Sequence, residues 1–125
     1  MNFFTSLFKK KQKTVPPPMP EWNAIVDMLY DQQLDTFADE VIDVIYSRDR
    51  SMRYIVLKEN AGLLTYQLEA IYQFDEDEWG YICACDNAFP AMWEPFRGVV
   101  GKSFFNNPEE LLRSMESEPE YKQYF

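Results

Sequence analysis

Apolar and polar residues alternate most regularly from Leu64 to Phe74, which predicts a β-strand with one buried face. Apolar side chains fall on even positions and polar ones on odd positions, except at Ile71. A period of two residues is typical of a half-buried strand. The face that we expect to be buried consists of Tyr66, Leu68, Ala70, Tyr72 and Phe74. The face that we expect to meet solvent consists of Thr65, Gln67, Glu69 and Gln73.

An acidic run follows this strand and separates it from a second apolar stretch. The run consists of Asp75, Glu76, Asp77 and Glu78, and the stretch is Trp79–Cys85. Four adjacent carboxylates cannot be buried without a large desolvation cost. We therefore predict a solvated turn and a returning strand, so that Leu64–Cys85 forms a β-hairpin. Weak calcium binding is the less favoured interpretation, because the run lacks the spacing and glycine of a calcium loop.

Further helices and strands are predicted on both sides of this hairpin. Apolar residues at helical spacing indicate a helix over residues 20–32, and β-branched stretches indicate strands over residues 40–46 and 52–58. Asn107 as N-cap and Pro108 as first helical residue begin a C-terminal helix. Its buried side chains are expected to be Leu111, Leu112 and Met115. Residues 99–105 are expected to form a short edge strand, and residues 120–125 a short helical turn or an aromatic clasp.

The fold class predicted by this order of elements is α+β. We expect an N-terminal helix, a four- to five-stranded antiparallel meander sheet, and a C-terminal helix packed with the first on one face. The 125 residues suit one domain. We assign residues 20–125 to that domain and residues 1–19 to a basic, apolar N-terminal tail with a proline-rich linker.

The N-terminal tail is a short amphipathic segment with a basic end. Its apolar side chains are Phe3, Phe4, Leu7 and Phe8, and its cations are Lys9, Lys10, Lys11 and Lys13. Such a segment could bind an anionic membrane surface weakly. The alternative is that it packs on its own domain or on a neighbouring molecule. The prolines at positions 16, 17, 18 and 20 are typical of a stiff linker, and recognition as a PxxP ligand is a weaker alternative.

The charge distribution limits the partners that the domain can bind. The chain has a net charge of −9, but residues 14–125 hold eight basic against 21 acidic side chains, a net charge of −13. This charge repels phosphate backbones, which argues against nucleic acid and favours either a basic protein partner or simple solubility. Glu69, the acidic run and Asp43 are expected to form one continuous negative surface.

The chemical inventory predicts no catalysis. The absence of histidine removes the commonest general base and the histidine-dependent triads. Cys83 and Cys85 are too close along one strand for an ordinary disulfide, so reduced, buried thiols are favoured over a metal site or a nucleophile. We expect no cofactor and no metal. Without a secretory signal or a membrane span, we expect a cytoplasmic protein.

An apolar stretch, Phe89–Phe96, is the strongest candidate for a binding site. Its prolines at positions 90 and 95 favour a loop. Met92, Trp93 and Phe96 are then exposed anchors of an interface. The alternative is that the loop caps the sheet and that Trp93 belongs to the core.

The function that we predict is binding: a non-catalytic acidic module for a basic protein partner, with immunity proteins and inhibitors as the type considered. Candidate contacts are Met92, Trp93, Phe96, Asp75, Glu76, Asp77 and Glu78. The second interpretation is a small-molecule binder with an aromatic pocket between the sheet and the helices. A hydrolase without histidine ranks third. The oligomeric state is left open.

Overall fold

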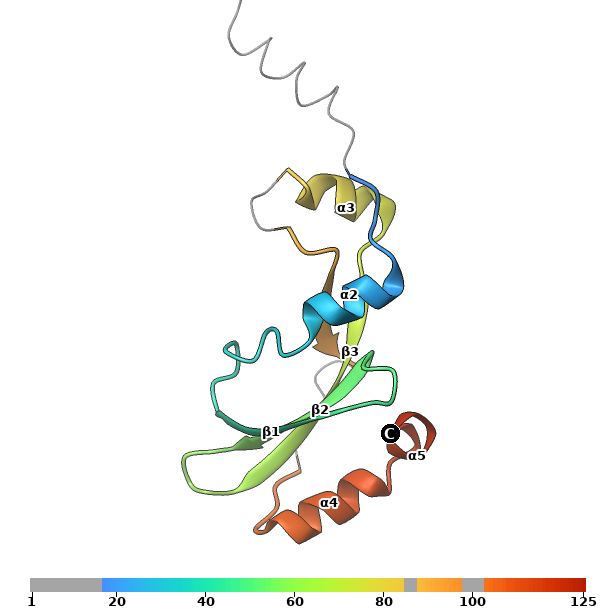
Figure 1. Cartoon of the computed structure of the whole chain (residues 1–125). Coiled ribbons are helices and arrows are strands. Elements are labelled where there is room, and N and C mark those ends of the chain that lie inside the picture. The colour runs from blue at the N-terminus through green and yellow to red at the C-terminus, as the bar shows by residue number, and fades with distance from the viewer. Residues whose placement is uncertain (1–16, 85–87, 98–102) are drawn as a thin grey trace, which may run out of the picture.

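A four-stranded antiparallel sheet forms the centre of the molecule, and its strands follow the order of the sequence (Figure 1). The computed structural model describes residues 17–84, 88–97 and 103–125. The strands are β1 (Glu40–Tyr46), β2 (Met52–Lys58), β3 (Leu64–Gln73) and β4 (Ala91–Pro95). The helices are α2 (Trp22–Leu29), α3 (Glu76–Ile82), α4 (Pro108–Glu116) and α5 (Pro119–Tyr124). The predicted α+β class and antiparallel sheet are confirmed.

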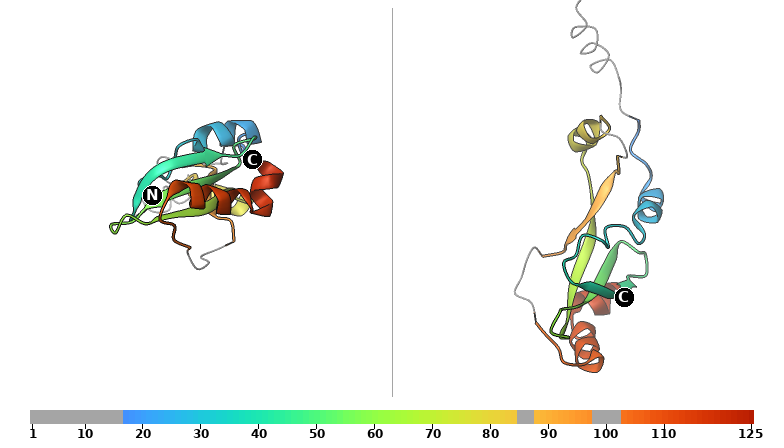
Figure 2. Two further views of the ribbon diagram at one scale, coloured as in Figure 1. Left: turned by 90° about the horizontal axis from the view of Figure 1, so that it is seen from below. Right: turned by 90° about the vertical axis from the view of Figure 1, so that its left-hand side faces the viewer.

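The helices cover both faces of the sheet, so the prediction that they share one face is wrong. Ile25 and Leu29 of α2 pack with Trp93 and Ala91 of β4. Leu111 and Met115 of α4 pack with Tyr54 of β2 and with the first three even positions of β3, which are Leu64, Tyr66 and Leu68. Successive strand residues point to opposite faces. Figure 2 accordingly shows α2 on one side of the strands and α4 with α5 on the other.

The double cover explains the composition of β2. Its residues from Met52 to Leu57 are all buried, including Arg53. A strand buried on both faces reads as a continuous apolar run. The odd face of β3 is covered as well, because Thr65 and Glu69 are only 1% and 5% exposed. The prediction that this face meets solvent is therefore wrong at both positions.

The acidic run begins a helix, so the predicted turn and returning strand are both wrong. The Asp75 side chain accepts a hydrogen bond from the Glu78 backbone N–H, and the Glu78 side chain accepts one from the Asp75 N–H. This reciprocal pair is a capping box, which satisfies two backbone donors at a helix start. Three acidic side chains also lie in the first turn of α3, where the helix dipole favours negative charge.

The strand that pairs with the second half of β3 is β4, within the stretch predicted as a loop. Tyr72 pairs with Met92 and Ile71 with Trp93. Proline is tolerated here because β4 is an edge strand, and Pro95 is its last residue. Of the edge strand predicted over residues 99–105, residues 99–102 lie outside the described residues. Phe105 forms an isolated bridge to Leu64.

The remaining local predictions are mostly confirmed. Strands β1 and β2 have the predicted bounds, and Asn107 caps α4 by accepting a hydrogen bond from the Glu110 N–H. Helix α2 is shorter than predicted at both ends. Leu112 is 43% exposed and does not join Leu111 and Met115 in the core, so that prediction is wrong. The predictions for residues 1–16 lie outside the described residues.

Candidate protein-binding surface

An apolar stripe lies on the half of the sheet that α4 and α5 leave uncovered. It consists of Tyr72 from β3, Met92 from β4 and Phe96, the residue directly after β4, which are 36%, 39% and 41% exposed. Tyr72 and Met92 are direct cross-strand partners, and the Phe96 N–H donates to the carbonyl of Leu68 at 3.0 Å. Cross-strand partners share one face of a sheet. We call these three residues the apolar stripe.

The position of the stripe follows from the lengths of the strands. Strand β3 has ten residues, and its first half packs on α4 through Leu64, Tyr66 and Leu68. Its second half extends toward α3 and pairs with β4, as Figure 1 shows. Helix α2 covers only the opposite face there, where it contacts Trp93 and Ile71. The even face of this half therefore carries the stripe.

Carboxylates of α3 and β4 lie next to the apolar stripe. The Tyr72 hydroxyl donates to Glu78 Oε1 at 2.6 Å, which joins the stripe to the first turn of α3. Glu94 of β4 lies between Met92 and Phe96 along the chain and is exposed. The hydrogen bond to Glu78 raises the pKa of Tyr72 to about 12, with the charges of Glu78, Asp75 and Glu94 adding to the effect. The phenol is therefore in a negative local field.

The acidic residues of the predicted site therefore gather at one end of the stripe. Asp75, Glu76 and Asp77 are exposed, and Glu78 is half-buried by its two hydrogen-bonded partners. Arg97, two residues after the end of β4, pairs with Glu120 of α5 and lies over the ring of Phe96. The stripe consequently has an acidic end at α3 and a mixed-charge end at α5.

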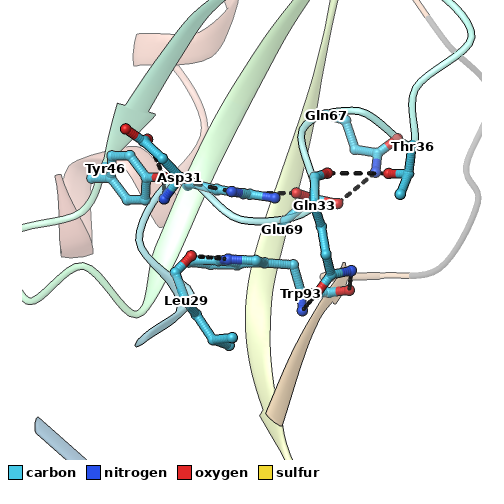
Figure 3. Close-up of polar contacts among 9 residues, drawn as sticks. Leu29, Asp31, Gln33, Thr36, Tyr46, Gln67, Glu69 and Trp93 are labelled. Carbon is cyan, nitrogen blue, oxygen red and sulfur yellow. Dashed lines mark hydrogen bonds and ion pairs between the residues drawn. The ribbon is translucent and has the colours of Figure 1, made fainter. Parts of the chain in front are cut away.

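Trp93 is part of the core, as the second of the two interpretations predicted, and it is only 2% exposed. Its indole N–H donates to the carbonyl of Leu29 at 2.8 Å. Its ring packs under the guanidinium of Arg53, 4.2 Å from the ring centroid. Figure 3 shows Trp93 between Leu29 and Gln33. The prediction that Trp93 contributes to a binding surface is therefore wrong, whereas Met92 and Phe96 are exposed as predicted.

Glu69 is also internal, so the predicted continuous negative surface with Asp43 is wrong. The Arg53 Nε–H donates to Glu69 Oε1 at 2.8 Å, and the two side chains are 0% and 7% exposed. Gln67 donates to the other carboxylate oxygen at 3.3 Å. Tyr46 accepts a longer bond of 3.5 Å from Arg53 and donates to Asp31 at 2.8 Å. These contacts, seen in Figure 3, form a polar network under α2.

On both outer edges of the sheet, side chains form hydrogen bonds with backbone groups that a further strand would otherwise pair with. Gln33 accepts from the Trp93 N–H at 2.8 Å and donates to the Trp93 carbonyl at 3.2 Å, which imitates a neighbouring strand. Pro95 has no N–H to offer. On β1, Asp43 accepts from the Val44 N–H at 2.8 Å. Blocked edges disfavour pairing with a further strand, so the face of the sheet is the more accessible contact surface.

A second polar cluster fastens the C-terminal helices to the sheet. Tyr54 and Tyr66 donate to the two carboxylate oxygens of Glu118 at 2.7 and 2.8 Å. Burial raises the pKa of Tyr66 to about 12, with Glu118 adding to the effect. The rings of Tyr121 and Phe125 stack on each other and lie tilted against Tyr54, and α5 confirms the helical turn, one of the two alternatives predicted for residues 120–125. These contacts give the cluster a structural role.

The cysteines contribute little to the picture. Cys83 is a free thiol at the C-terminal end of α3 rather than on a strand, and Cys85 lies outside the described residues. Within the described ranges, no group of three Cys, Asp or Glu side chains is placed to hold a metal ion. None of the helices in these ranges is long and apolar enough to cross a bilayer.

Comparison with family models, with curated proteins and with solved structures finds no match.

Two sequence signals that the predicted turn and loop overlooked could have revealed this surface. The spacing Asp75-x-x-Glu78 ahead of Trp79 is that of a capping box, which indicates a helix start. The alternation of Ala91, Trp93 and Pro95 with Met92, Glu94 and Phe96 is that of a strand. Tyr72 was expected to be core, and its exposure depends on where α4 ends.

Proposed function

We propose that this chain is a non-catalytic binding module that receives a basic, partly apolar segment of another protein on the apolar stripe. The observation that carries the proposal is the contact of Tyr72 with Glu78, which places exposed apolar side chains directly beside the carboxylates of α3. Exposed apolar groups in contact with one another mark interaction sites more often than scattered ones do.

The chemistry of the surface supports a basic partner. Carboxylates beside the stripe speed the encounter with lysine- or arginine-rich segments and repel acidic ones. The aromatic and thioether side chains of the stripe then supply apolar contact area, and aromatic residues and methionine are enriched in interfaces. An inhibitor or immunity protein that acts on a basic target would use the same two contributions, charge for the encounter and apolar contact area for affinity.

The proposal can be tested by selecting binders from a library of random peptides displayed on phage. The full chain is immobilised, and enriched sequences are read by deep sequencing. We expect enrichment of peptides that combine Lys or Arg with apolar residues. Peptides that are enriched without basic residues, or no enrichment above an unrelated acidic protein, would contradict the proposal.

Matched variants locate the binding surface. D75N/E76Q/D77N/E78Q removes four negative charges but keeps oxygen acceptors at both positions of the capping box. E40Q/E109Q/E110Q/E116Q also removes four negative charges, from exposed positions on β1 and α4, and serves as the control. We expect the selected peptides to lose affinity at least tenfold for the first variant and to bind the second as they bind the parent chain. Equal losses for the two variants would indicate only a general charge effect.

A further inference from the structure

We propose that the basic N-terminal segment of the same chain, residues 3–13, docks on the apolar stripe and competes with the external partner. The inference rests on the proposed function, because it names a regulator of the same surface. Its occupant is a segment outside the described residues, and it is identified by its sequence and by where the described chain begins.

The point of attachment lies beside the surface. The described chain begins at Pro17, whose carbonyl accepts a hydrogen bond of 2.7 Å from the Trp79 indole N–H on α3. Trp79 is 8% exposed, and the residue before it, Glu78, contacts Tyr72. The chain preceding Pro17 therefore starts from the helix that borders the apolar stripe.

The reach of the segment suits the distance along the stripe. Lys13 precedes Pro17 by four residues and Lys9 by eight. An extended chain spans at most about 3.5 Å per residue, so the lysines can reach to about 14 and 28 Å from Pro17. Two residues that lie three positions apart on one strand, such as Met92 and Pro95, are separated by about 10 Å. The lysines can thus reach the carboxylates of α3 as well as Glu94.

The composition of the segment is complementary to the surface. The segment holds four lysines, and the end of the stripe at α3 carries four carboxylates, those of Asp75, Glu76, Asp77 and Glu78. The apolar residues of the segment precede the lysines, so they fall farther from Pro17. The charged part would then lie near α3 and the apolar part farther along the stripe, toward Phe96.

Tethering makes a weak contact effective. A short linker gives an effective concentration of about 1 mM. A segment with an intrinsic dissociation constant of about 0.1 mM would then occupy the stripe for about nine-tenths of the time. An external peptide would bind about tenfold more weakly than to a chain whose segment cannot dock.

Zero-length cross-linking of the full chain tests the inference. A carbodiimide joins lysine amines to carboxylates in direct contact, and digestion with mass spectrometry identifies the linked peptides. A mixture of ¹⁵N-labelled and unlabelled chains separates links within one chain from links between chains. We expect Lys9–Lys13 to be joined to Asp75–Glu78 or to Glu94, within one chain.

Docking must be distinguished from random collision of a tethered segment. M92S and F96S remove apolar contacts but leave every lysine and carboxylate in place, and we expect each to lower the yield of these links at least threefold. The control is L112S, because Leu112 is exposed to a similar degree on α4, at 43% against 39% for Met92. We expect L112S to leave the yield unchanged.

Three results would overturn the inference: no link to the carboxylates of the surface, a yield that M92S and F96S leave unchanged, or links only between differently labelled chains. The last would assign the stripe to a second copy. The full chain should also bind a selected peptide about tenfold more tightly when Lys9, Lys10, Lys11 and Lys13 are changed to Gln. If a selected peptide binds but M92S and F96S do not change the yield of the cross-links, the proposed function stands and only this inference is overturned.

Discussion

The buried ion pair between Arg53 and Glu69 gives the sharpest prediction for stability. Changing Glu69 to Leu leaves a guanidinium inside the sheet with no carboxylate beside it. Arg53 is 0% exposed, and one of its terminal nitrogens already has no hydrogen-bond partner among the described residues. The charge therefore has no route to water unless the cover of the sheet opens.

The expected cost follows from the burial of both groups. Removing one partner of a buried ion pair costs about 3–5 kcal/mol, because the remaining charge stays desolvated. Arg53→Met should cost a similar amount, since it also removes the contact of the guanidinium with the Trp93 ring. The double variant R53M/E69L leaves no charge behind, and replacement by apolar groups of similar volume is often neutral or stabilising. We expect it to lie within about 1 kcal/mol of the parent chain.

The assay is urea-induced unfolding at pH 7, followed by far-ultraviolet circular dichroism. The free energies of the parent, the two single variants and the double variant form a double-mutant cycle, and we expect a coupling of more than about 3 kcal/mol. A loss below about 1 kcal/mol for Glu69→Leu would refute the reasoning. It would mean that Arg53 reaches solvent in the native state, and hence that α2 and residues 30–39 do not cover this face.

Three further predictions test other parts of the fold. The pKa of Tyr66 is raised to about 12, so the contribution of the Tyr66 phenol to stability is complete below pH 10 and is lost as the pH rises toward 12. Tyr66→Phe should flatten this decline in stability. Tyr81→Phe, at an 80% exposed position, should not. Leu68→Ala should cost about 1–3 kcal/mol in a urea melt, less than at a fully buried site, and a loss below 0.5 kcal/mol would show that α4 does not cover this position. Gln33→Ala frees the backbone groups of Trp93 on the β4 edge and should increase concentration-dependent association relative to the parent chain in sedimentation velocity, whereas unchanged sedimentation would show that this edge is blocked by other means.

Local signals predicted the first three strands because each is bounded by residues with clear turn chemistry. Arg50 and Gly62 adopt positive φ between β1, β2 and β3, and glycine adopts this conformation without strain. The bounds of β1 and β2 therefore match the prediction. The start of α4 was equally clear, because Asn107 and Pro108 are favoured at the N-cap and the first helical position.

Tertiary cover was harder to predict than secondary structure. Glu69 was assigned to solvent because it is charged, and only its partner on the neighbouring strand makes its burial tolerable. Arg53 within an otherwise apolar strand was the available clue, since a continuous buried run implies cover on both faces. The turn assigned to Asp75–Glu78 failed because four carboxylates suit a helix start as well as a solvated turn.

The candidate site was predicted in part. Met92, Phe96 and the acidic run were named from composition, but their proximity depends on β4 pairing with β3 and on α3 beginning directly after β3. Tyr72 was missed because alternation alone cannot show that α4 covers only the first half of a ten-residue strand. Trp93 lies on the opposite face from Met92 because successive residues of a strand point to opposite faces.

The proposed role of the acidic surface is tested most directly by the association rate of a selected basic peptide as a function of ionic strength. We expect the rate for the parent chain to fall steeply with added salt. The variant D75N/E76Q/D77N/E78Q should associate about tenfold more slowly at low salt and with a flatter salt dependence, while the control E40Q/E109Q/E110Q/E116Q, which removes the same number of charges elsewhere, should stay close to the parent. Equal rates and equal slopes for all three chains would contradict the proposal, and the carboxylates of α3 would then serve only to begin the helix.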